Sequence, residues 1–289
     1  MEDMSRLGTR EITLTGGEVS GRNDFVEIVN KATEKFCIVN VLTNGYYITD
    51  ENIYKIRHNS NKNILWQVSI DGLENVHNSI RGTKNSYKKA IEAIEILKRY
   101  QYFVSISSTI NKENVDQMEA IYQLIKELKV DRLSFGMIIE KGRAKNSEIE
   151  VNKFFIDKYQ YLLKKSQNDG IMIDFDNVDF EKEDENQKYK KGCGLGTNFL
   201  GIQPNGNVVL CPAFDIPIGN IREKSINEII SIQNLKSIYQ LIPPSKELCS
   251  SCKVIKECEN CHAVPYNKNL LDCKWKEINK KILGELIFR

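Results

Sequence analysis

The chain has 289 residues, of which 41% are hydrophobic and 28% are charged. This composition is that of an ordinary globular protein, and it excludes collagen-like, disordered and membrane-spanning chains. Lys and Arg exceed Asp and Glu by only two residues, so no broad basic surface is expected to hold nucleic acid or a membrane. The acidic start after Met1 is unlike a secretory signal. We therefore expect a cytoplasmic protein that binds neither nucleic acid nor membrane.

Short β-rich apolar runs alternate with segments of helical periodicity in the first 165 residues. The runs predicted as strands are residues 11–15, 37–42, 64–70, 102–110 and 132–139. The segments predicted as helices are residues 24–35, 50–57, 87–99, 115–128 and 153–165. This alternation predicts an α/β fold with a parallel sheet covered by helices, either doubly wound or closed as a barrel.

Polar residues and glycines cluster where the predicted strands end, which is where parallel α/β folds bind ligands. The residues that would meet at this edge are Gly16, Gly17, Glu18, Asn44, Ser69, Asp71, Arg81 and Asn111. Each of them alone could equally be a helix cap or a turn residue. Together, their carboxylate, amide, hydroxyl and guanidinium groups suit a zwitterionic small molecule.

The composition changes after residue 165 to Asp, Glu, Lys and Asn, with one short apolar run at residues 171–175. We therefore divide the chain into a first domain of residues 1–165, a charged connector of residues 166–192 and a second domain of residues 193–289. In the second domain, residues 199–211 are predicted to form a β-hairpin around an Asn-Gly turn. Residues 225–242 are predicted to form one amphipathic helix.

Seven of the eight cysteines lie in the second domain, which predicts a metal centre there. They are Cys193, Cys211, Cys249, Cys252, Cys258, Cys261 and Cys273. The run C-x2-C-x5-C-x2-C contains two C-x2-C pairs, each of which presents two thiolates on one turn. Iron-sulfur clusters, a zinc site and disulfides are all possible. The short spacer and the number of thiols favour iron-sulfur over a single zinc, and a reducing compartment disfavours disulfides.

Taken together, these motifs resemble the radical S-adenosylmethionine (SAM) enzymes of the SPASM group, and the chain looks similar to anaerobic sulfatase-maturating enzymes. Gly16-Gly17-Glu18, Thr43-Asn44-Gly45 and the segment from Ser69 to Arg81 resemble that family's SAM-binding motifs. The cysteines follow its seven-cysteine pattern, except that two residues instead of three separate Cys258 from Cys261. The resemblance implies an incomplete (β/α)6 radical SAM barrel, which is TIM-like, followed by a small Cys-rich iron-sulfur SPASM domain.

The resemblance also implies cofactors and residue roles. SAM would be bound with its ammonium at Glu18 and its carboxylate at Arg81, with Ser69 adding a hydroxyl contact and His77 orienting the segment. Up to two auxiliary 4Fe-4S clusters would be present. Cys249, Cys252, Cys258 and Cys273 would hold the outer cluster. Cys193, Cys211 and Cys261 would hold the inner one, which lacks a fourth cysteine.

The family's primary cluster is held by a C-x3-C-x2-C loop, and this sequence contains no such motif. We therefore expect the barrel to begin at the family's second strand and the chain as written to be truncated and inactive. It would be a gene remnant, the product of a start set too far downstream, or a homologue without that cluster.

The function implied by the resemblance is modification of a ribosomally made peptide or protein side chain by hydrogen abstraction with a 5'-deoxyadenosyl radical. The partners would be that substrate and an electron donor such as flavodoxin or ferredoxin. Two alternatives stay open. One is a non-catalytic peptide-binding iron-sulfur module, and the other is a zinc-binding protein.

Overall fold

The computed structural model describes the chain except for residues 57–62, 138–152, 177–194, 197–198, 215, 253–257, 259–260, 268–271 and 288–289. The chain divides into two compact units, Met1–Lys182 and Glu183–Arg289. Each unit has its own hydrophobic core. In the described part of the chain, no helix combines the length and the apolar character needed to cross a membrane.

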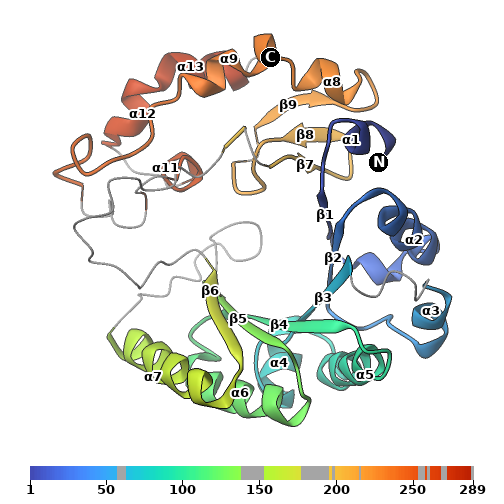
Figure 1. Cartoon of the computed structure of the whole chain (residues 1–289). Helices are drawn as coiled ribbons and strands as arrows, with labels where there is room; N and C mark the ends of the chain where they lie inside the picture. The colour runs from blue at the N-terminus through green and yellow to red at the C-terminus, as the bar shows by residue number, and fades with distance from the viewer. Residues whose placement is uncertain are drawn as a thin grey trace. The chain divides into compact units, whose positions relative to one another are not determined.

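The first unit is built on a six-stranded parallel sheet whose strands follow one another in chain order. The strands are β1 (Glu11–Leu14), β2 (Ile38–Thr43), β3 (Ile64–Ser69), β4 (Phe103–Ile110), β5 (Arg132–Met137) and β6 (Met172–Asp176). Because each crossover leads to the next strand in the same direction, right-handed crossovers place all helices on one face. This is the winding of a barrel wall, and the doubly wound alternative is excluded (Figure 1).

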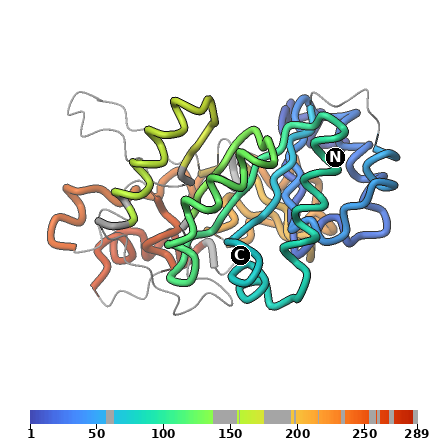
Figure 2. The backbone as a smooth tube through the Cα atoms, turned by 90° about the horizontal axis from the view of Figure 1, so that it is seen from below, coloured from blue at the N-terminus to red at the C-terminus, as the bar shows by residue number. Residues whose placement is uncertain are grey.

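Helices cover the convex side of this curved sheet (Figure 1). They are α2 (Phe25–Lys35), α3 (Asp50–Lys55), α4 (Glu74–Arg81), α5 (Ser86–Arg99), α6 (Met118–Glu127) and α7 (Lys153–Asp169), with short 3-10 turns η1 (Val19–Gly21) and η3 (Val115–Gln117). A further helix, α1 (Glu2–Arg6), precedes β1. Figure 2 follows the same alternation of strand and helix from below. The predicted α/β architecture is confirmed, and the five predicted strands and helices are found with ends shifted by a few residues.

The two faces of the sheet differ in chemistry. Most side chains that point to the helices are apolar and buried, for example Val41, Trp66 and Phe135. Alternate residues point the other way, to what we call the inner face, and many of these are polar, as with Gln67 and Ser107. The inner face is therefore not filled as an apolar core.

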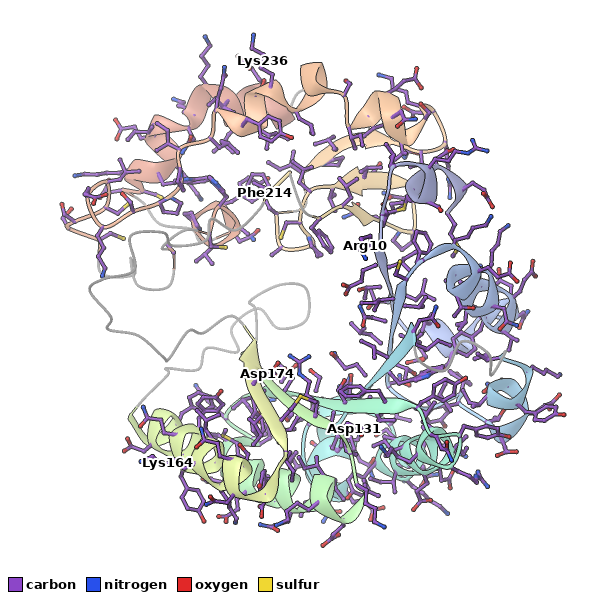
Figure 3. The ribbon with its side chains drawn as sticks, in the orientation of Figure 1. Arg10, Asp131, Lys164, Asp174, Phe214 and Lys236 are labelled. Carbon is purple, nitrogen blue, oxygen red and sulfur yellow. The ribbon has the colours of Figure 1, made fainter. Side chains whose placement is uncertain are left out.

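The second unit combines a small antiparallel sheet with short helices. Its strands are β7 (Gly201–Ile202), β8 (Asn207–Val209) and β9 (Pro217–Asn220). Its described helices are α8 (Ile226–Ile229), α9 (Ile232–Tyr239), α11 (Ala263–Asn267), α12 (Lys274–Ile278) and α13 (Lys280–Ile287). The predicted hairpin is confirmed, and Gly206 adopts φ 90° at its turn. Phe214, labelled in Figure 3, packs edge-on against Tyr266 in the core of this unit.

Two sequence-based expectations differ from the structure. The segment expected as a connector from residue 166 contains the end of α7 and all of β6, which pairs with β5. The sequence did not predict β6 as a strand, because it is only five residues long and charged residues surround it. The single helix expected at residues 225–242 is two helices, because Ile229 of α8 packs into one apolar cluster and Leu235 of α9 into another.

Candidate functional site

Glu18 joins the carboxyl ends of β1 and β2. Its Oε1 accepts hydrogen bonds from the backbone N–H of Ser20 (3.0 Å) and from the hydroxyls of Ser20 and Thr43. Its Oε2 accepts from the backbone N–H of Asn44 (2.6 Å). The carboxylate thus caps η1, and both of its oxygens accept from protein donors, Oε2 from one only. The contact expected between Glu18 and a ligand ammonium stays a prediction, and such a ligand would have to share these oxygens.

The loop after β2 is held in a shape that only glycine permits. Gly45 adopts φ 80°, and a Cβ at this position would lie 2.9 Å from the Cα of Ala90 on α5. The side chain of Asn44 accepts a hydrogen bond from the backbone N–H of Tyr46 (2.9 Å), so it stabilises the turn. Gly16 and Gly17, in contrast, are exposed, and no atom would contact an added Cβ there.

Asp71 and Arg81 form an ion pair at the end of β3. Nη2 of Arg81 lies 2.7 Å from Oδ2 of Asp71, whose side chain is 4% exposed. Oδ1 of Asp71 accepts from the backbone N–H of Thr109 at the end of β4 (3.0 Å). Sequence reasoning assigned both side chains to a ligand, whereas in this structure they bind each other. The Nε atom of Arg81 is buried and has no partner in the described part of the chain.

His77 orients the same segment from α4. Its ring is fully buried, and Nδ1 accepts a hydrogen bond from the backbone N–H of Asp71 (3.1 Å). Burial lowers the pKa of His77 to about 4, and the neighbouring positive charge of Arg81 also lowers it, while Asp71 acts in the opposite direction. The imidazole is therefore neutral near pH 7. Its contact with Asp71 agrees with the orienting role expected from the sequence.

Asn114, in the loop after β4, is a further site residue that the sequence reasoning missed. Its side chain is fully buried and donates to the carbonyls of Asp71 (2.9 Å) and Thr109 (2.8 Å). Its Oδ1 accepts from the backbone N–H of Asn111 (2.7 Å). Asn114 therefore fastens the ends of β3 and β4 together. The only available signal was the pair of asparagines three residues apart after an apolar strand.

The structure thus brings four of the expected strand-edge residues together in two separate contacts. Glu18 contacts the loop that carries Asn44, and Asp71 contacts Arg81. Ser69 lies at the end of β3 on the inner face, half-buried. Asn111 does not contribute its side chain to the edge, because its Oδ1 accepts from the backbone N–H of Glu113 within its own loop (2.8 Å).

The second unit holds the cysteine centre. Its described cysteines, Cys211, Cys249, Cys252, Cys258, Cys261 and Cys273, are free thiols, and Cys193 lies outside the described residues. Both C-x2-C pairs form tight turns, since the N–H of Cys252 donates to the carbonyl of Cys249 and that of Cys261 to Cys258 (both 2.9 Å). Disulfides, one of the sequence-based alternatives, are absent among these six residues.

Three of these thiols lie near one another. Burial raises the pKa of the Cys249 thiol, and the neighbouring Cys252 and Cys273 raise it further. Three thiolates this close repel one another unless a cation binds between them. Within the described ranges, no three His, Cys, Asp or Glu side chains already surround a metal position. These soft thiol donors, of which Cys249 is buried and the other two half-buried, nevertheless fit an iron-sulfur cluster or zinc, and not a hard cation such as Mg²⁺.

His262, next to Cys261, adds a second sign that this centre takes a further group. The residue is 9% exposed, and its ring centroid lies 5.8 Å from that of Trp275. Nδ1 is buried without a partner in the structure as described. A buried imidazole nitrogen without a partner is costly, and a nearby cluster would satisfy it.

A hydrogen-bonded clamp connects Cys273 to the segment that leads to Cys249. Cys273 caps α12, and Asn279, immediately after this helix, is fully buried. The Asn279 side chain accepts from the N–H of Ile242 (2.9 Å) and donates to its carbonyl (3.1 Å), which also accepts from Nε1 of Trp275 (2.8 Å). The chain then passes through two prolines to Ser245, whose carbonyl accepts from the N–H of Cys249 (2.9 Å).

Comparison with family models identifies both regions. Residues 1–125 match the radical SAM superfamily, and residues 193–262 match SPASM, an iron-sulfur cluster-binding domain. The first match contains the strand edge of Glu18, Asp71 and Arg81. The second contains the hairpin and six of the seven cysteines of the second unit.

Curated relatives and solved structures agree with these matches. The sporulation killing factor maturation protein SkfB of Bacillus subtilis is 29% identical over 79% of this chain and 55% of its own length. An AdoMet-dependent heme synthase of Methanosarcina barkeri is 25% identical over 92% of this chain and 81% of its own length. The crystal structure of Streptococcus suis SuiB bound to S-adenosylmethionine matches with a TM-score of 0.74 at 16% identity, over 93% of this chain and 65% of that one. The chain thus spans about half the length of SkfB and under two thirds of SuiB.

Proposed function

Because this chain belongs to the radical SAM superfamily and carries a SPASM iron-sulfur domain, we propose that it is part of a maturase that modifies a ribosomally made peptide or protein side chain. The observation that carries the proposal is the presence of both motif sets on one chain. The strand edge of the first unit carries the SAM-type residues, and the second unit carries the thiol centre. SkfB, whose name assigns it to the maturation of a killing factor, supports a peptide substrate.

In this proposal the strand edge binds SAM and the thiol centre binds auxiliary 4Fe-4S clusters. A primary 4Fe-4S cluster with a free iron, whose C-x3-C-x2-C motif is not found in this sequence, would supply the electron that splits SAM into methionine and a radical able to abstract a substrate hydrogen. Cys249, Cys252, Cys258 and Cys273 would hold the outer cluster, and Cys193, Cys211 and Cys261 the inner one.

The chain's own residues would bind and orient SAM. Arg81 would turn its free Nε–H toward the methionyl carboxylate while Asp71 holds Nη2 in place. Ser69 would add a hydroxyl contact from the end of β3. Neutral His77 and Asn114 would keep the backbone of Asp71 in position, because each binds one of its main-chain groups. An electron donor such as flavodoxin or ferredoxin would serve the clusters.

A tetrapyrrole substrate is the second candidate, since one relative is an AdoMet-dependent heme synthase. The inner face of the sheet favours the peptide. Its residues include Gln67 and Ser107, which offer hydrogen-bonding groups suited to a peptide and stand beside the apolar Leu65 and Phe103. Titration of the reconstituted protein with iron coproporphyrin should therefore give no change in the porphyrin's visible spectrum.

The proposal is tested by anaerobic reconstitution of the chain with iron and sulfide. We expect about four iron atoms and about four sulfides for each cluster formed. Protein that takes up only zinc, without sulfide, would refute the iron-sulfur assignment. Formation of 5'-deoxyadenosine from SAM and dithionite is then measured for the 289-residue chain. The same assay is run on the chain extended by any in-frame genomic sequence upstream, and turnover is expected only where a C-x3-C-x2-C motif is present.

A further inference from the structure

A continuous row of polar side chains crosses the inner face of the parallel sheet. Ser69 on β3 is the register partner of Ser107 on β4, and Ser107 is the partner of Ser134 on β5. Ser134 is in turn the partner of Asp174 on β6. Register partners in neighbouring strands point to the same face and lie about 5 Å apart. Three hydroxyls therefore lead across the sheet to one carboxylate, and none of them belongs to the apolar core on the other side.

The far end of this row has two unsatisfied polar atoms side by side. Oγ of Ser134 is buried, with the residue 5% exposed, and it has no hydrogen-bond partner among the described residues. Oδ1 of Asp174 is also buried and unpartnered there. Figure 3 labels Asp174 on the side of β6 that faces away from α6 and α7. A buried carboxylate oxygen without a donor costs about 1–3 kcal/mol or more, so Oδ1 is an acceptor that a hydrogen-bond donor from another molecule would satisfy.

The other carboxylate oxygen of Asp174 is already paired. Oδ2 forms an ion pair with Arg132, which lies on the same face of the neighbouring strand. Because the guanidinium balances the negative charge, the free Oδ1 suits a neutral N–H donor better than a second cation. The hydroxyl of Ser134 can donate to a carbonyl beside it. One acceptor and one donor about 5 Å apart match the N–H and C=O groups of a peptide main chain.

We propose that Ser134 and Asp174 form a subsite on the inner face that binds an uncharged amide group of a peptide, with Arg132 fixing the carboxylate. This deepens the proposed function and rests on its assignment of a peptide substrate. The row places Ser134 two strands and Asp174 three strands from Ser69, on the order of 10 Å and 15 Å away. Asp174 and Ser134 are thus specificity-determining residues that hold the peptide beside the strand edge.

The test uses the full chain and a defined probe, acetyl-Gly-Gly-N-methylamide, titrated by saturation-transfer difference NMR. A matched ester analogue, in which oxygen replaces the N–H groups, is titrated in parallel. We expect saturable binding of the amide and at least about tenfold weaker binding of the ester, which is the effect of losing one good hydrogen bond.

Three variants locate the subsite. Asp174→Asn keeps the shape, but its amide oxygen would face Arg132 and its NH2 would replace the acceptor, so the amide probe should bind about tenfold more weakly. Ser134→Ala should weaken binding several-fold. Ser108→Ala is the matched control, because Ser108 on β4 also has a buried, unpartnered hydroxyl but points to the helices. It should leave the affinity unchanged.

Equal affinity of the wild type and the Asp174→Asn variant would overturn the inference, as would equal binding of amide and ester or no saturable binding at all. A loss of affinity in Ser108→Ala as large as in Ser134→Ala would also overturn it. Thermal unfolding of each variant confirms that it is folded. None of these readouts depends on iron. A negative result here would therefore refute the subsite without affecting the iron-sulfur assignment, and failure of the iron-sulfur assignment would leave the subsite test unchanged.

Discussion

The guanidinium of Arg81 lies 2.7 Å from the carboxylate of Asp71, and this ion pair joins helix α4 to the end of strand β3. The pair is asymmetric, because Asp71 is almost completely buried while the Arg81 side chain is 31% exposed. The aspartate also accepts from the backbone of the next strand. Loss of its charge therefore affects both the ion pair and the edge of the sheet.

Asp71→Asn should lower the free energy of unfolding by about 1–3 kcal/mol, since it leaves a partly buried guanidinium without its counter-charge. Urea unfolding of the first unit measures this change. Asp24→Asn is the matched control, because Asp24 pairs with Arg22 at 2.8 Å but both side chains are largely exposed. It should have little effect. Equal destabilisation by the two variants would contradict a special role for the buried pair.

His77 should make the first unit less stable in mild acid. Its folded pKa is about 4, below the value of 6.5 in the unfolded chain, so the unfolded state binds a proton first as the pH falls. The stabilisation is fully present above about pH 6.5 and is lost between there and pH 4, at up to about 1.4 kcal/mol per pH unit. Urea unfolding followed by Trp66 fluorescence in a Trp275→Phe background measures this slope. His77→Gln, which keeps an acceptor for Asp71, should flatten it, and an unchanged slope would contradict the assignment.

Gly45→Ala should destabilise the first unit by about 2 kcal/mol or more. The new methyl group would meet the backbone of α5 in a left-handed conformation, so strain and overpacking add. Gly17→Ala provides the control, because the space around Gly17 is open, and its effect should stay within about 0.5 kcal/mol. Thermal unfolding of both variants is the measurement. An unchanged unfolding temperature for Gly45→Ala would contradict the prediction and show that α5 moves to make room for the methyl group.

Cys249→Ser should lose the iron and sulfide of one cluster and destabilise the second unit, because metal binding supplies part of the folding free energy of so small a segment. Iron and sulfide content after reconstitution is measured together with thermal unfolding. Cys37→Ser is the control, since Cys37 is exposed and lies in the first unit. It should retain full iron content. Full iron content in the Cys249→Ser variant would remove Cys249 from the ligand set.

Asn279→Ala should lower the stability of the second unit by about 2–4 kcal/mol, because it leaves the buried N–H of Ile242 without an acceptor and breaks two further bonds. Fluorescence of Trp275, in a Trp66→Phe background, follows the unfolding. Asn205→Ala, which removes one exposed turn contact in the same unit, serves for comparison and should cost much less. A similar cost for both would mean that the clamp contributes little.

Much of the first unit could be predicted because its signals are local. The apolar run at residues 64–70 gives β3 at Ile64–Ser69, and the helical period before Arg99 gives α5 at Ser86–Arg99. β6 was missed because five residues in a charged setting carry too little pattern, and only pairing with β5 defines them as a strand. The break between α8 and α9 likewise follows from two separate apolar clusters, which no periodicity reveals.

At the site, too, the sequence predicts where residues lie but not which residues they bind. The sequence indicates that Glu18, Asp71 and Arg81 lie at strand ends, because glycines and turn residues mark those ends. It cannot indicate that Arg81 binds Asp71, since that choice depends on how α4 packs behind β3. Asn114 was missed for a related reason. An asparagine in a loop looks like any turn residue until its burial and its two carbonyl partners are known.

The alternation between helix-facing and inner-facing residues separates two kinds of evolutionary change. Substitutions at Val41, Trp66 or Phe135 disturb close packing and lower the free energy of unfolding, so these positions can vary little. Substitutions at Ser107 or Ser134 leave that core intact and change only the chemistry offered by the inner face. A sheet of this kind can therefore acquire new binding preferences one residue at a time while the fold retains its margin of stability.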